Sequence, residues 1–503
     1  MPGAANGTGL EIAASPPGTT KVDAVGAASS CSDAAQQLSA CAWLTVLGAL
    51  DPCESPLCIG HASPSEQQAM RASGVAIQPA HTPAWLAENA SIKTSTDKRL
   101  PRFTTVLRMR DRRETVKRGL LSHQAARRLP GQILEKAART TIEARRISGE
   151  WGVLSYRIRM PAVRVGLIGY GAWGRHHARA IASVPDAELK AICARSPESA
   201  ADARRDYPQS SIYADYRELL EREQLELCDV VLPSDLHYDV SRAVLESGRH
   251  LLLEKPMTLS IARCRELIAL AQARGRVLAV GHELRLSSLW GKVKELVDAD
   301  AIGEPLYALI ELWRRPYRPG SGGWRYDIRR VGSWILEEPI HFFDLARWYL
   351  SGAGDPVSIY ARANGKRADH PELHDNFSAI VNFPGGRYAV ISQTLAAWEH
   401  HQTAKLTGTK GAIWASWSGA MDRTFEPTFN LKLQMGDTLS DVPIDKPSGE
   451  VYELVDEVAA VVRAIGDGTP VPCTGEDGLW SVAMCLKAAE SLESGQPVRL
   501  PGE

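Results

Sequence analysis

The sequence lacks a long apolar run and has no excess of charge of either sign. Across 503 residues, 58 Lys and Arg offset 59 Asp and Glu, which leaves a formal net charge of -1. The chain therefore has no general electrostatic attraction to nucleic acid or to a membrane. No run approaches the roughly 18 apolar residues of a membrane-spanning helix. The apolar stretch at 39–50 has no basic leader close before it, which argues against a secretory signal.

Paired cysteines are also missing. Nine cysteines are scattered along the chain, and none lies in a CxxC or a Cys/His metal-binding spacing. We therefore expect no metal site. Cys193, Cys228 and Cys485 lie in apolar runs, where a reduced and buried thiol is expected. This usage fits a protein of the reducing cytoplasm.

Residues 1–159 differ in composition from the rest of the chain. The first thirty residues are mainly small or polar and would bury too little apolar surface to fold. Residues 93–149 are rich in Lys and Arg without clean strand alternation, although 132–147 has the spacing of a short helix, and no nucleic-acid-binding motif accompanies them. Two interpretations of 1–159 stay open: a gene model extended beyond a natural start at Met160, or a genuine disordered extension.

From residue 160 to 282, apolar strands alternate with helical patterns. The strand segments include "AVRVGLIGYG", "AELKAICA", "CDVVLP" and "RHLLLEKP", and helical spacing separates them. Strand–helix–strand units of this kind form a parallel, doubly wound sheet covered on both faces, a Rossmann domain. The near-continuous apolar character of these strands agrees with a sheet buried on both faces.

Residues 283–503 have a different texture. Strand patterns such as "PLYALIELWRRP" and "FSAIVNFPGG" are separated by turn signals, while "FFDLARWYL" and "VYELVDEVAAVVRAIGDG" have helical spacing. We expect an α+β domain with a large, open-faced and mostly antiparallel sheet. The last helix is expected to end at Gly495.

A glycine-rich loop follows the first strand of the Rossmann segment. In "GLIGYGAWGRHH", Gly169, Gly171 and Gly174 have the spacing of a dinucleotide fingerprint, with Ala172 and Trp173 between them. Gly169 permits the tight turn, Gly171 lets a pyrophosphate approach the backbone, and Gly174 allows close packing of helix and strand. The helix that follows offers free N–H groups to the phosphates.

The end of the second strand bears on the choice of cofactor. An Asp or Glu is expected there in an NAD-binding protein, whereas this sequence has Ala194, Arg195 and Ser196. Arg195 and Ser196 could bind a 2′-phosphate. The pattern therefore favours NADP over NAD, although an arginine can also stack on adenine while NAD binds.

Charged residues end the apolar strand in "HLLLEKPMTLS" at 250–260. Lys255 is expected at the carboxyl end of a parallel strand, where ligands bind in doubly wound sheets. Pro256 keeps Lys255 out of helical geometry, and a cis Lys255–Pro256 bond is a natural expectation. A solvated Glu254–Lys255 pair is the alternative, but an ammonium here would stabilise negative charge on a reacting oxygen.

The glycine fingerprint, "DVVLPSDLH" and "GRHLLLEKPMTLS" together resemble the Gfo/Idh/MocA oxidoreductases, which include glucose–fructose oxidoreductase and inositol dehydrogenase. The resemblance covers about 160–503. It implies that the Rossmann domain binds NAD(P) and that the C-terminal domain carries the substrate. Most members oxidise or reduce a carbon of a sugar, cyclitol or related polyol, so the resemblance implies a dehydrogenase or reductase.

The resemblance also implies roles for single residues. Lys255 matches the active-site lysine, and Pro233, His237 and Glu254 match positions beside the cofactor. In "ILEEPIHFFDLARW", His341 matches the catalytic histidine and Asp344 the later aspartate. Glu337 and Pro339 replace the usual Asp and Gly. A histidine is suited to general-base work because its ordinary pKa lies near neutrality.

A segment rich in arginine and glycine, 312–334, precedes this motif. It holds six arginines and could close over a substrate. The candidate substrate contacts are Trp324, Arg325, Glu338 and Asp344. A solvated surface loop is the alternative. If the segment is functional, its arginines indicate a substrate with a carboxylate or phosphate. His400 and His401 are neighbours on a strand, so at most one can face a site.

These expectations leave three functions open. The first is an NAD(P)-dependent oxidoreductase acting on a secondary alcohol of a polyol or sugar acid. The second is a glycoside-processing enzyme with retained NAD, and the third is a non-catalytic dinucleotide sensor. The presence of both Lys255 and His341 favours catalysis. An open-faced sheet must cover its exposed face, so we expect a homodimer or homotetramer.

Overall fold

The computed structural model describes residues 161–395 and 397–500, together with the backbone of four strands between 90 and 159. The chain divides into two compact units, Met1–Arg159 and Met160–Glu503. Each unit is described by itself. Among the helices of these described residues, none is long and apolar enough to cross a membrane.

The first unit contains a four-stranded antiparallel sheet in the order β1-β2-β4-β3. Its strands are β1 (Ala90–Lys93), β2 (Val106–Met109), β3 (Thr141–Ile147) and β4 (Val153–Arg159). The helix expected over 132–147 is therefore wrong over Thr141–Ile147. This segment contains three β-branched residues, which favour strands, and β4 pairs with all seven of its residues. Residues 132–140 lie outside the described part.

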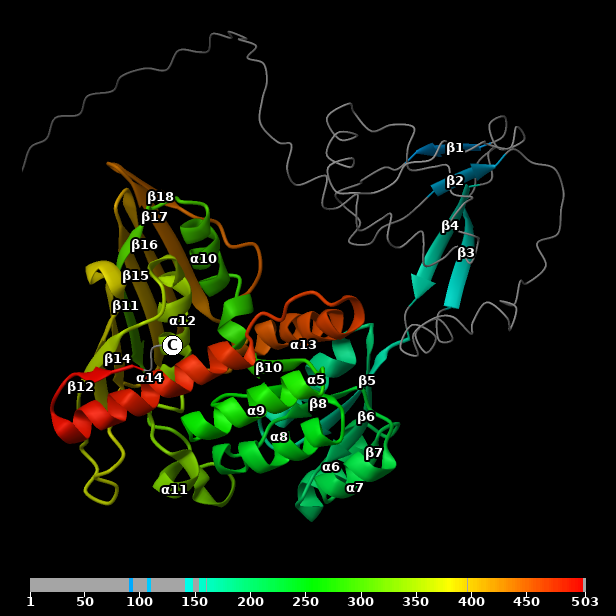
Figure 1. The fold of residues 1–503 in the computed structure, drawn as a ribbon, viewed down its shortest axis with the longest axis horizontal. Coiled ribbons are helices and arrows are strands. Elements are labelled where there is room, and N and C mark those ends of the chain that lie inside the picture. The colour runs from blue at the N-terminus through cyan, green and yellow to red at the C-terminus, as the bar shows by residue number, and fades with distance from the viewer. Residues whose placement is uncertain are drawn as a thin grey trace, which may run out of the picture. The chain divides into compact units, whose positions relative to one another are not determined.

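The second unit begins with a six-stranded parallel sheet in the order β10-β9-β8-β5-β6-β7, covered by helices (Figure 1). The strands are β5 (Val163–Ile168), β6 (Ala187–Cys193), β7 (Ser211–Tyr213), β8 (Leu227–Val230), β9 (His250–Glu254) and β10 (Leu278–Gly281). The helices are α5 (Gly174–Ser183), α6 (Pro197–Asp206), α7 (Tyr216–Arg222), η3 (Ser234–Leu236), α8 (His237–Glu246) and α9 (Ile261–Ala273). This confirms the doubly wound domain. The strand order reverses between β5 and β8, where such folds bind ligands.

A nine-stranded sheet follows, in the order β18-β17-β16-β15-β11-β14-β13-β12-β19. Every neighbouring pair is antiparallel except β11 and β14, which confirms the mostly antiparallel sheet. Its strands are β11 (Pro305–Trp313), β12 (Ser358–Asn364), β13 (Asn376–Asn382), β14 (Tyr388–Thr394), β15 (His400–Gly408), β16 (Gly411–Gly419), β17 (Thr428–Met435), β18 (Thr438–Asp441) and β19 (Val498–Arg499).

Helices cover one face of this sheet, and none of the described helices covers the other (Figure 1). The elements between and after the strands are η4 (Glu283–Leu286), α10 (Trp290–Asp298), η5 (Ser321–Tyr326), α11 (Ile328–Val331), α12 (Pro339–Tyr349), η6 (Ser351–Ala353), η7 (Pro384–Gly386), α13 (Glu450–Asp467) and α14 (Gly475–Ser494). Alternate strand residues are buried under α12 and α14. The opposite face carries exposed apolar side chains, among them Trp313, Ile380, Tyr388 and Trp414.

The end of the chain returns to the parallel sheet. Helix α13 packs against α5, and its Leu454, Val458 and Val461 are buried in the core of the Rossmann domain. The segment before α14 then lies along the edge strand β10: Val280 N–H donates to the Cys473 carbonyl at 3.2 Å, and Thr474 forms a bridge with Ala279. Helix α14 ends at Gly495 in left-handed geometry, as expected.

Candidate active site

The glycine loop has the geometry that its spacing predicts. Gly169 has a φ of +113°, and a Cβ on it would lie 2.0 Å from the Val231 carbonyl oxygen. A Cβ on Gly174 would lie 1.9 Å from the Gly169 carbonyl oxygen, so the helix start packs directly on the turn. A Cβ on Gly171 would meet nothing within 4 Å. The loop is therefore closed on its protein side and open at Gly171, beside the start of α5, which fits the pyrophosphate of a dinucleotide.

After β6, Ala194 is buried, and Arg195 and Ser196 lie at the surface. Arg195 is exposed, and none of the described residues forms an ion pair with it. The Ser196 hydroxyl caps α6 by accepting from the Ser199 N–H at 3.1 Å. Pro233 precedes η3. His237 is fully buried, with Nδ1 2.6 Å from the Pro256 carbonyl oxygen and Nε2 2.8 Å from that of Leu232. These contacts make it a support for the turn that carries Lys255.

Glu254, the last residue of β9, joins the glycine loop to the lysine motif. Its Oε1 accepts from the Trp173 indole N–H at 2.8 Å and lies 3.0 Å from His177 Nε2. Its Oε2 accepts from the Lys255 backbone N–H at 3.1 Å. The other ring nitrogen of His177, Nδ1, lies 2.8 Å from Asp229 Oδ2 at the end of β8. Trp173 and Glu254, predicted as cofactor-loop residues, are thus in direct contact.

His177 is a buried cation in this network. Burial alone lowers the pKa of His177, but the carboxylates of Asp229 and then Glu254 outweigh it and raise that pKa well above its ordinary value. Burial likewise works against ionised Glu254, yet the hydrogen bond from His177 and its charge hold the Glu254 pKa at about 2. His177 and Glu254 are therefore both ionised near neutral pH.

Lys255 lies at the meeting point of the two domains. The Lys255–Pro256 bond is cis, as expected. The ammonium donates to the Glu337 carbonyl oxygen at 2.5 Å. Burial lowers the pKa of Lys255, but the carboxylates of Glu337, Glu338, Glu254 and Glu283 outweigh it and raise that pKa above its ordinary value. Lys255 therefore keeps its positive charge near neutral pH.

His341 lies in the first turn of α12, which begins at Pro339. It is 3% exposed, and burial, followed by the charge of Lys255, lowers its pKa well below the ordinary value. Nε2 lies 3.8 Å from Glu283 Oε1, and Nδ1 has no hydrogen-bond partner in the described part of the chain. Burial also raises the pKa of Glu283 well above its usual range. His341 is thus a neutral, incompletely bonded imidazole within the field of the ammonium.

The remaining candidate residues fall into two groups. Glu337 and Glu338 lie at the start of α12, and each carboxylate is paired with an arginine, Arg325 and Arg314 respectively. Trp324 and Asp344 are buried, and the Trp324 ring lies 4.7 Å from the guanidinium carbon of Arg325. Trp324 belongs to an aromatic cluster with Tyr317 and Trp334. Both oxygens of Asp344 accept from Arg285 at 2.7 Å, so Asp344 anchors α12. Their roles as substrate contacts remain predictions without direct support from this geometry.

Several site residues were not found from the sequence. His177, Asp229 and Glu283 were not singled out, and neither was Arg285. His177 offered one signal, because it lies four residues before Ile181 on the buried face of α5. A histidine on an apolar helix face needs polar partners. Those partners lie 52 and 77 residues away in the chain, so the sequence could not identify them.

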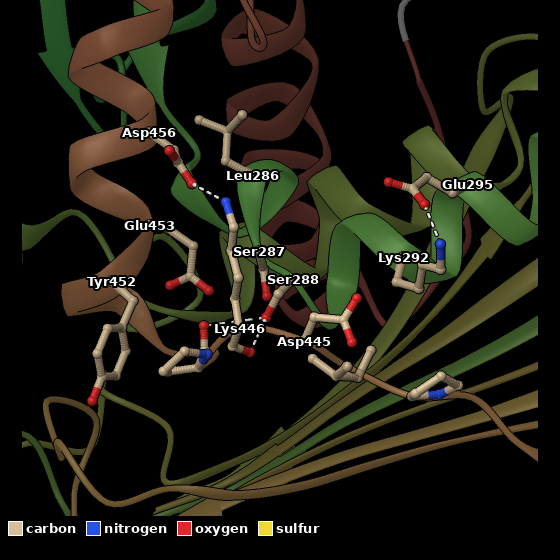
Figure 2. Close-up of a pocket in the computed structure, with 13 residues that line it drawn as sticks. Leu286, Ser287, Ser288, Lys292, Glu295, Asp445, Lys446, Tyr452, Glu453 and Asp456 are labelled. Carbon is tan, nitrogen blue, oxygen red and sulfur yellow. Dashed lines mark hydrogen bonds and ion pairs between the residues drawn. The ribbon is translucent and has the colours of Figure 1, made fainter. Parts of the chain in front are cut away.

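Figure 2 shows a separate crevice. It is lined by residues that follow β10, by the 443–447 segment and by the first turns of α13, including Ser287, Lys446 and Glu453. Lys446 and Asp456 face each other across it at 3.9 Å. Neither Lys255 nor His341 lines this crevice, so it is distinct from the lysine–histidine site.

Two family models match the chain. An oxidoreductase family with an NAD-binding Rossmann fold matches residues 163–282, and the GFO/IDH/MocA C-terminal domain matches 290–414. The chain is 29% identical over 352 residues to the uncharacterized oxidoreductase YrbE of Bacillus subtilis. That alignment covers 67% of this chain and 96% of YrbE. It is 26% identical over 347 residues to the myo-inositol 2-dehydrogenase of Thermotoga maritima, over 67% of this chain and 98% of that protein.

A solved structure has the same fold. The aldose-aldose oxidoreductase from Caulobacter crescentus, complexed with glycerol, matches with a TM-score of 0.59 at 21% identity, over 67% of this chain and 100% of that one. The two family models follow each other in the order of the two domains described above, and the curated relatives are matched over almost their whole length. The chain therefore belongs to the GFO/IDH/MocA oxidoreductase family.

Proposed function

We propose that this oxidoreductase transfers hydride between NAD(P) and a secondary alcohol carbon of a sugar, cyclitol or related polyol. The observation that carries the proposal is the meeting of Lys255, which follows β9, with Glu337, just before α12, and His341, in the first turn of α12, both from the other domain. Strand β9 is next to β8, and β8 is next to the glycine-loop strand β5. The myo-inositol 2-dehydrogenase relative supports a cyclitol-like substrate.

The protonation states suggest how the two residues divide the chemistry. The bound dinucleotide would accept or supply the hydride. Lys255, which stays positively charged, stabilises negative charge on the reacting oxygen. His341, which stays neutral, is free to take the proton of the hydroxyl group. Glu337, held by Arg325, is placed to accept a hydrogen bond from a neighbouring hydroxyl.

The cofactor, assembly and location are parts of the same proposal. Arg195, exposed just after β6, favours NADP over NAD. The residues at this position, Ala194, Arg195 and Ser196, include no carboxylate that would repel a 2′-phosphate. The exposed apolar face of the nine-stranded sheet supports a homodimer or homotetramer. Light scattering that gives the mass of a single chain would contradict this assembly. The five described cysteines are free and buried, which supports a cytoplasmic protein.

A spectrophotometric screen tests the function. Sugars, cyclitols and sugar acids are offered with NAD and NADP in parallel, and absorbance of the reduced cofactor is followed. On a confirmed substrate, Lys255→Ala should lower kcat by about a hundredfold, equivalent to about 3 kcal/mol, while dinucleotide affinity stays near that of the wild type. Lys292→Ala, which removes a lysine outside the site, is the matched control and should change neither quantity.

Three results would contradict or redirect the proposal. Turnover of Lys255→Ala within a factor of two of the wild type would contradict the role of the ammonium. Cofactor binding without turnover of any polyol would favour a dinucleotide sensor. Glycoside cleavage with a tightly held, unchanged cofactor would favour the glycoside-processing alternative.

A further inference from the structure

The arginines of the 312–334 segment are largely neutralised by carboxylates of the same unit. Four of the six form ion pairs: Arg314 with Glu338, Arg325 with Glu337, Arg329 with Asp327, and Arg330 with Asp235. The carboxylates of the first two pairs lie at the start of α12, three and four residues before His341. The arginines that could attract an acidic substrate there are therefore already compensated.

Arg314 is the more fully enclosed of these two. Its side chain is 11% exposed. Besides the Glu338 carboxylate, it has Asp422 Oδ2 at 3.5 Å from Nη2 and the Tyr317 ring at 4.6 Å from the guanidinium carbon. An arginine binds a carboxylate best through two parallel N–H groups. With these neighbours in place, Arg314 does not present such an edge to a ligand.

Glu338 is an unusual residue for its position. It is the residue before the first turn of α12, yet its side chain makes no capping bond, and it is only 6% exposed. One oxygen accepts from Arg314. The other lies 3.5 Å from His400 Nε2 and has no hydrogen-bond partner among the described residues. A buried carboxylate with one oxygen unbonded is costly, which indicates a role for Glu338 beyond packing.

The two acidic groups with the largest effect on Lys255 are already paired with arginines. Glu337 and then Glu338 raise the pKa of Lys255 most, and they pair with Arg325 and Arg314 respectively. A substrate carboxylate near the reacting carbon would therefore meet neither arginine unpaired and would be repelled by these two carboxylates, since like charges brought together in a low-dielectric site oppose binding strongly. A hydroxyl group would meet none of this repulsion and could donate a hydrogen bond to a carboxylate.

We propose that Glu338, by neutralising Arg314, makes the site selective for an uncharged polyol and excludes the corresponding sugar acid. The proposal rests on the proposed function, because it names the substrate class of the same site. It assigns Glu338 as a specificity-determining residue that acts through Arg314. The sequence indicated an acidic substrate if these arginines were functional, whereas in the structure Arg314 and Arg325 pair with carboxylates of the protein itself.

Matched ligand pairs test this selectivity in the full-length protein with NAD or NADP bound. Aldohexoses are compared with their uronic acids, for example glucose with glucuronate and galactose with galacturonate. Binding is measured by calorimetry, and kcat/KM by reduction of the cofactor. The wild type should prefer the neutral member at least tenfold. Glu338→Gln exposes the charge of Arg314 and should shift the ratio at least tenfold toward the acid.

Three further variants complete the design. Glu338→Asp keeps the charge and should keep the preference for the neutral member. Arg314→Gln leaves the Glu338 carboxylate without its cation and should bind the acid more weakly than the wild type does. This variant provides an independent test if Glu338→Gln folds poorly. Glu304→Gln, which breaks the surface pair between Glu304 and Arg387, is the matched control and should leave the ratio unchanged.

The outcomes separate this proposal from the proposed function. A wild type that prefers the acid, or a Glu338→Gln variant with an unchanged ratio, overturns the assignment of Glu338 even if polyols are oxidised. Binding of neither member of any pair contradicts the substrate class. Neutral ligands that bind preferentially but are never turned over support the selectivity and contradict the hydride-transfer function.

Discussion

Replacing His177 with glutamine should destabilise the protein in a strongly pH-dependent way. Glutamine keeps two hydrogen-bonding groups but cannot carry a charge. His177 is 0% exposed and lies 2.8 Å from Asp229 and 3.0 Å from Glu254, which are also buried. His177→Gln therefore leaves two buried carboxylates without their cation. One oxygen of Asp229 already lacks a partner among the described residues.

The magnitude follows from this burial. Removing one member of a buried ion pair typically costs about 3–5 kcal/mol, because the partner charge remains uncompensated. At an unfolding entropy of about 2 cal/mol/K per residue, a loss of about 4 kcal/mol in a unit the length of Met160–Glu503 lowers Tm by about 5 °C. Surface histidines contribute far less, since water already solvates them.

The sign of the pH dependence is fixed by the direction of the shifts. The pKa of His177 is raised in the folded protein. The stability that His177 contributes is therefore fully present below the pKa of an unfolded histidine, about 6.5, and is lost as pH rises through the folded pKa. Glu254 has a folded pKa of about 2, so its contribution is present above about 4.5 and is lost as pH falls toward 2. The difference in free energy of unfolding between the wild type and His177→Gln, which we call the gap, should therefore be largest between about pH 4.5 and 6.5.

Thermal unfolding followed by circular dichroism at pH 5.5, 7.5 and 9 measures the gap. His176→Gln is the matched control on the same helix. Burial, followed by Arg423, lowers the pKa of His176 to about 4, so it is neutral throughout this range. A gap for His177→Gln that is below about 1 kcal/mol, or that does not narrow between pH 5.5 and 9, would refute the ionised network.

Three further predictions concern the cofactor domain and its boundary. Gly171→Ala should weaken dinucleotide binding without changing Tm, whereas Gly174→Ala should lower Tm, because only the second Cβ collides with backbone; equal effects of the two on Tm would contradict the loop geometry. Arg195→Asp should shift the ratio of the dissociation constants toward NAD by weakening NADP, and an unchanged ratio in fluorescence titrations would contradict the proposed 2′-phosphate contact. Removal of 1–159 should leave a soluble, cofactor-binding protein, and failure of the shortened chain to bind NAD or NADP would place part of the fold before Met160.

Local patterns of the sequence were sufficient for much of the fold. The glycine loop and Gly495 at the end of α14 depend on backbone conformation within a few residues, and both are found where they were expected. The helix expected over 132–147 is wrong over Thr141–Ile147, because pairing with β4 overrides its helical spacing. Strands β17 and β18 were not predicted. The sequence of β17, TFNLKLQM, does alternate polar and apolar residues, so its signal was overlooked, whereas β18 has only four residues and is exposed throughout.

The candidate site was harder to predict, because its contacts are distant in the chain. Lys255 and His341, to which we propose to assign the chemistry, were recognised from their motifs. Their surroundings were not, since Lys255 meets Glu337 across 82 residues and Arg285 meets Asp344 across 59. The arginines of 312–334 led to the expectation of an acidic substrate. Partners such as Glu338, 24 residues from Arg314, became visible only in the folded chain.

The return of the chain to β10 has a consequence for biosynthesis. The backbone groups of this edge strand that pair with Cys473 and Thr474 have no partner until nearly the whole chain has left the ribosome. The apolar surface that Leu454, Val458 and Val461 cover is exposed over the same period. An incomplete sheet edge beside exposed apolar surface invites pairing with other chains. Premature termination anywhere before α13 should therefore yield a nascent chain that depends on chaperones, even though all six strands of its parallel sheet have been synthesised.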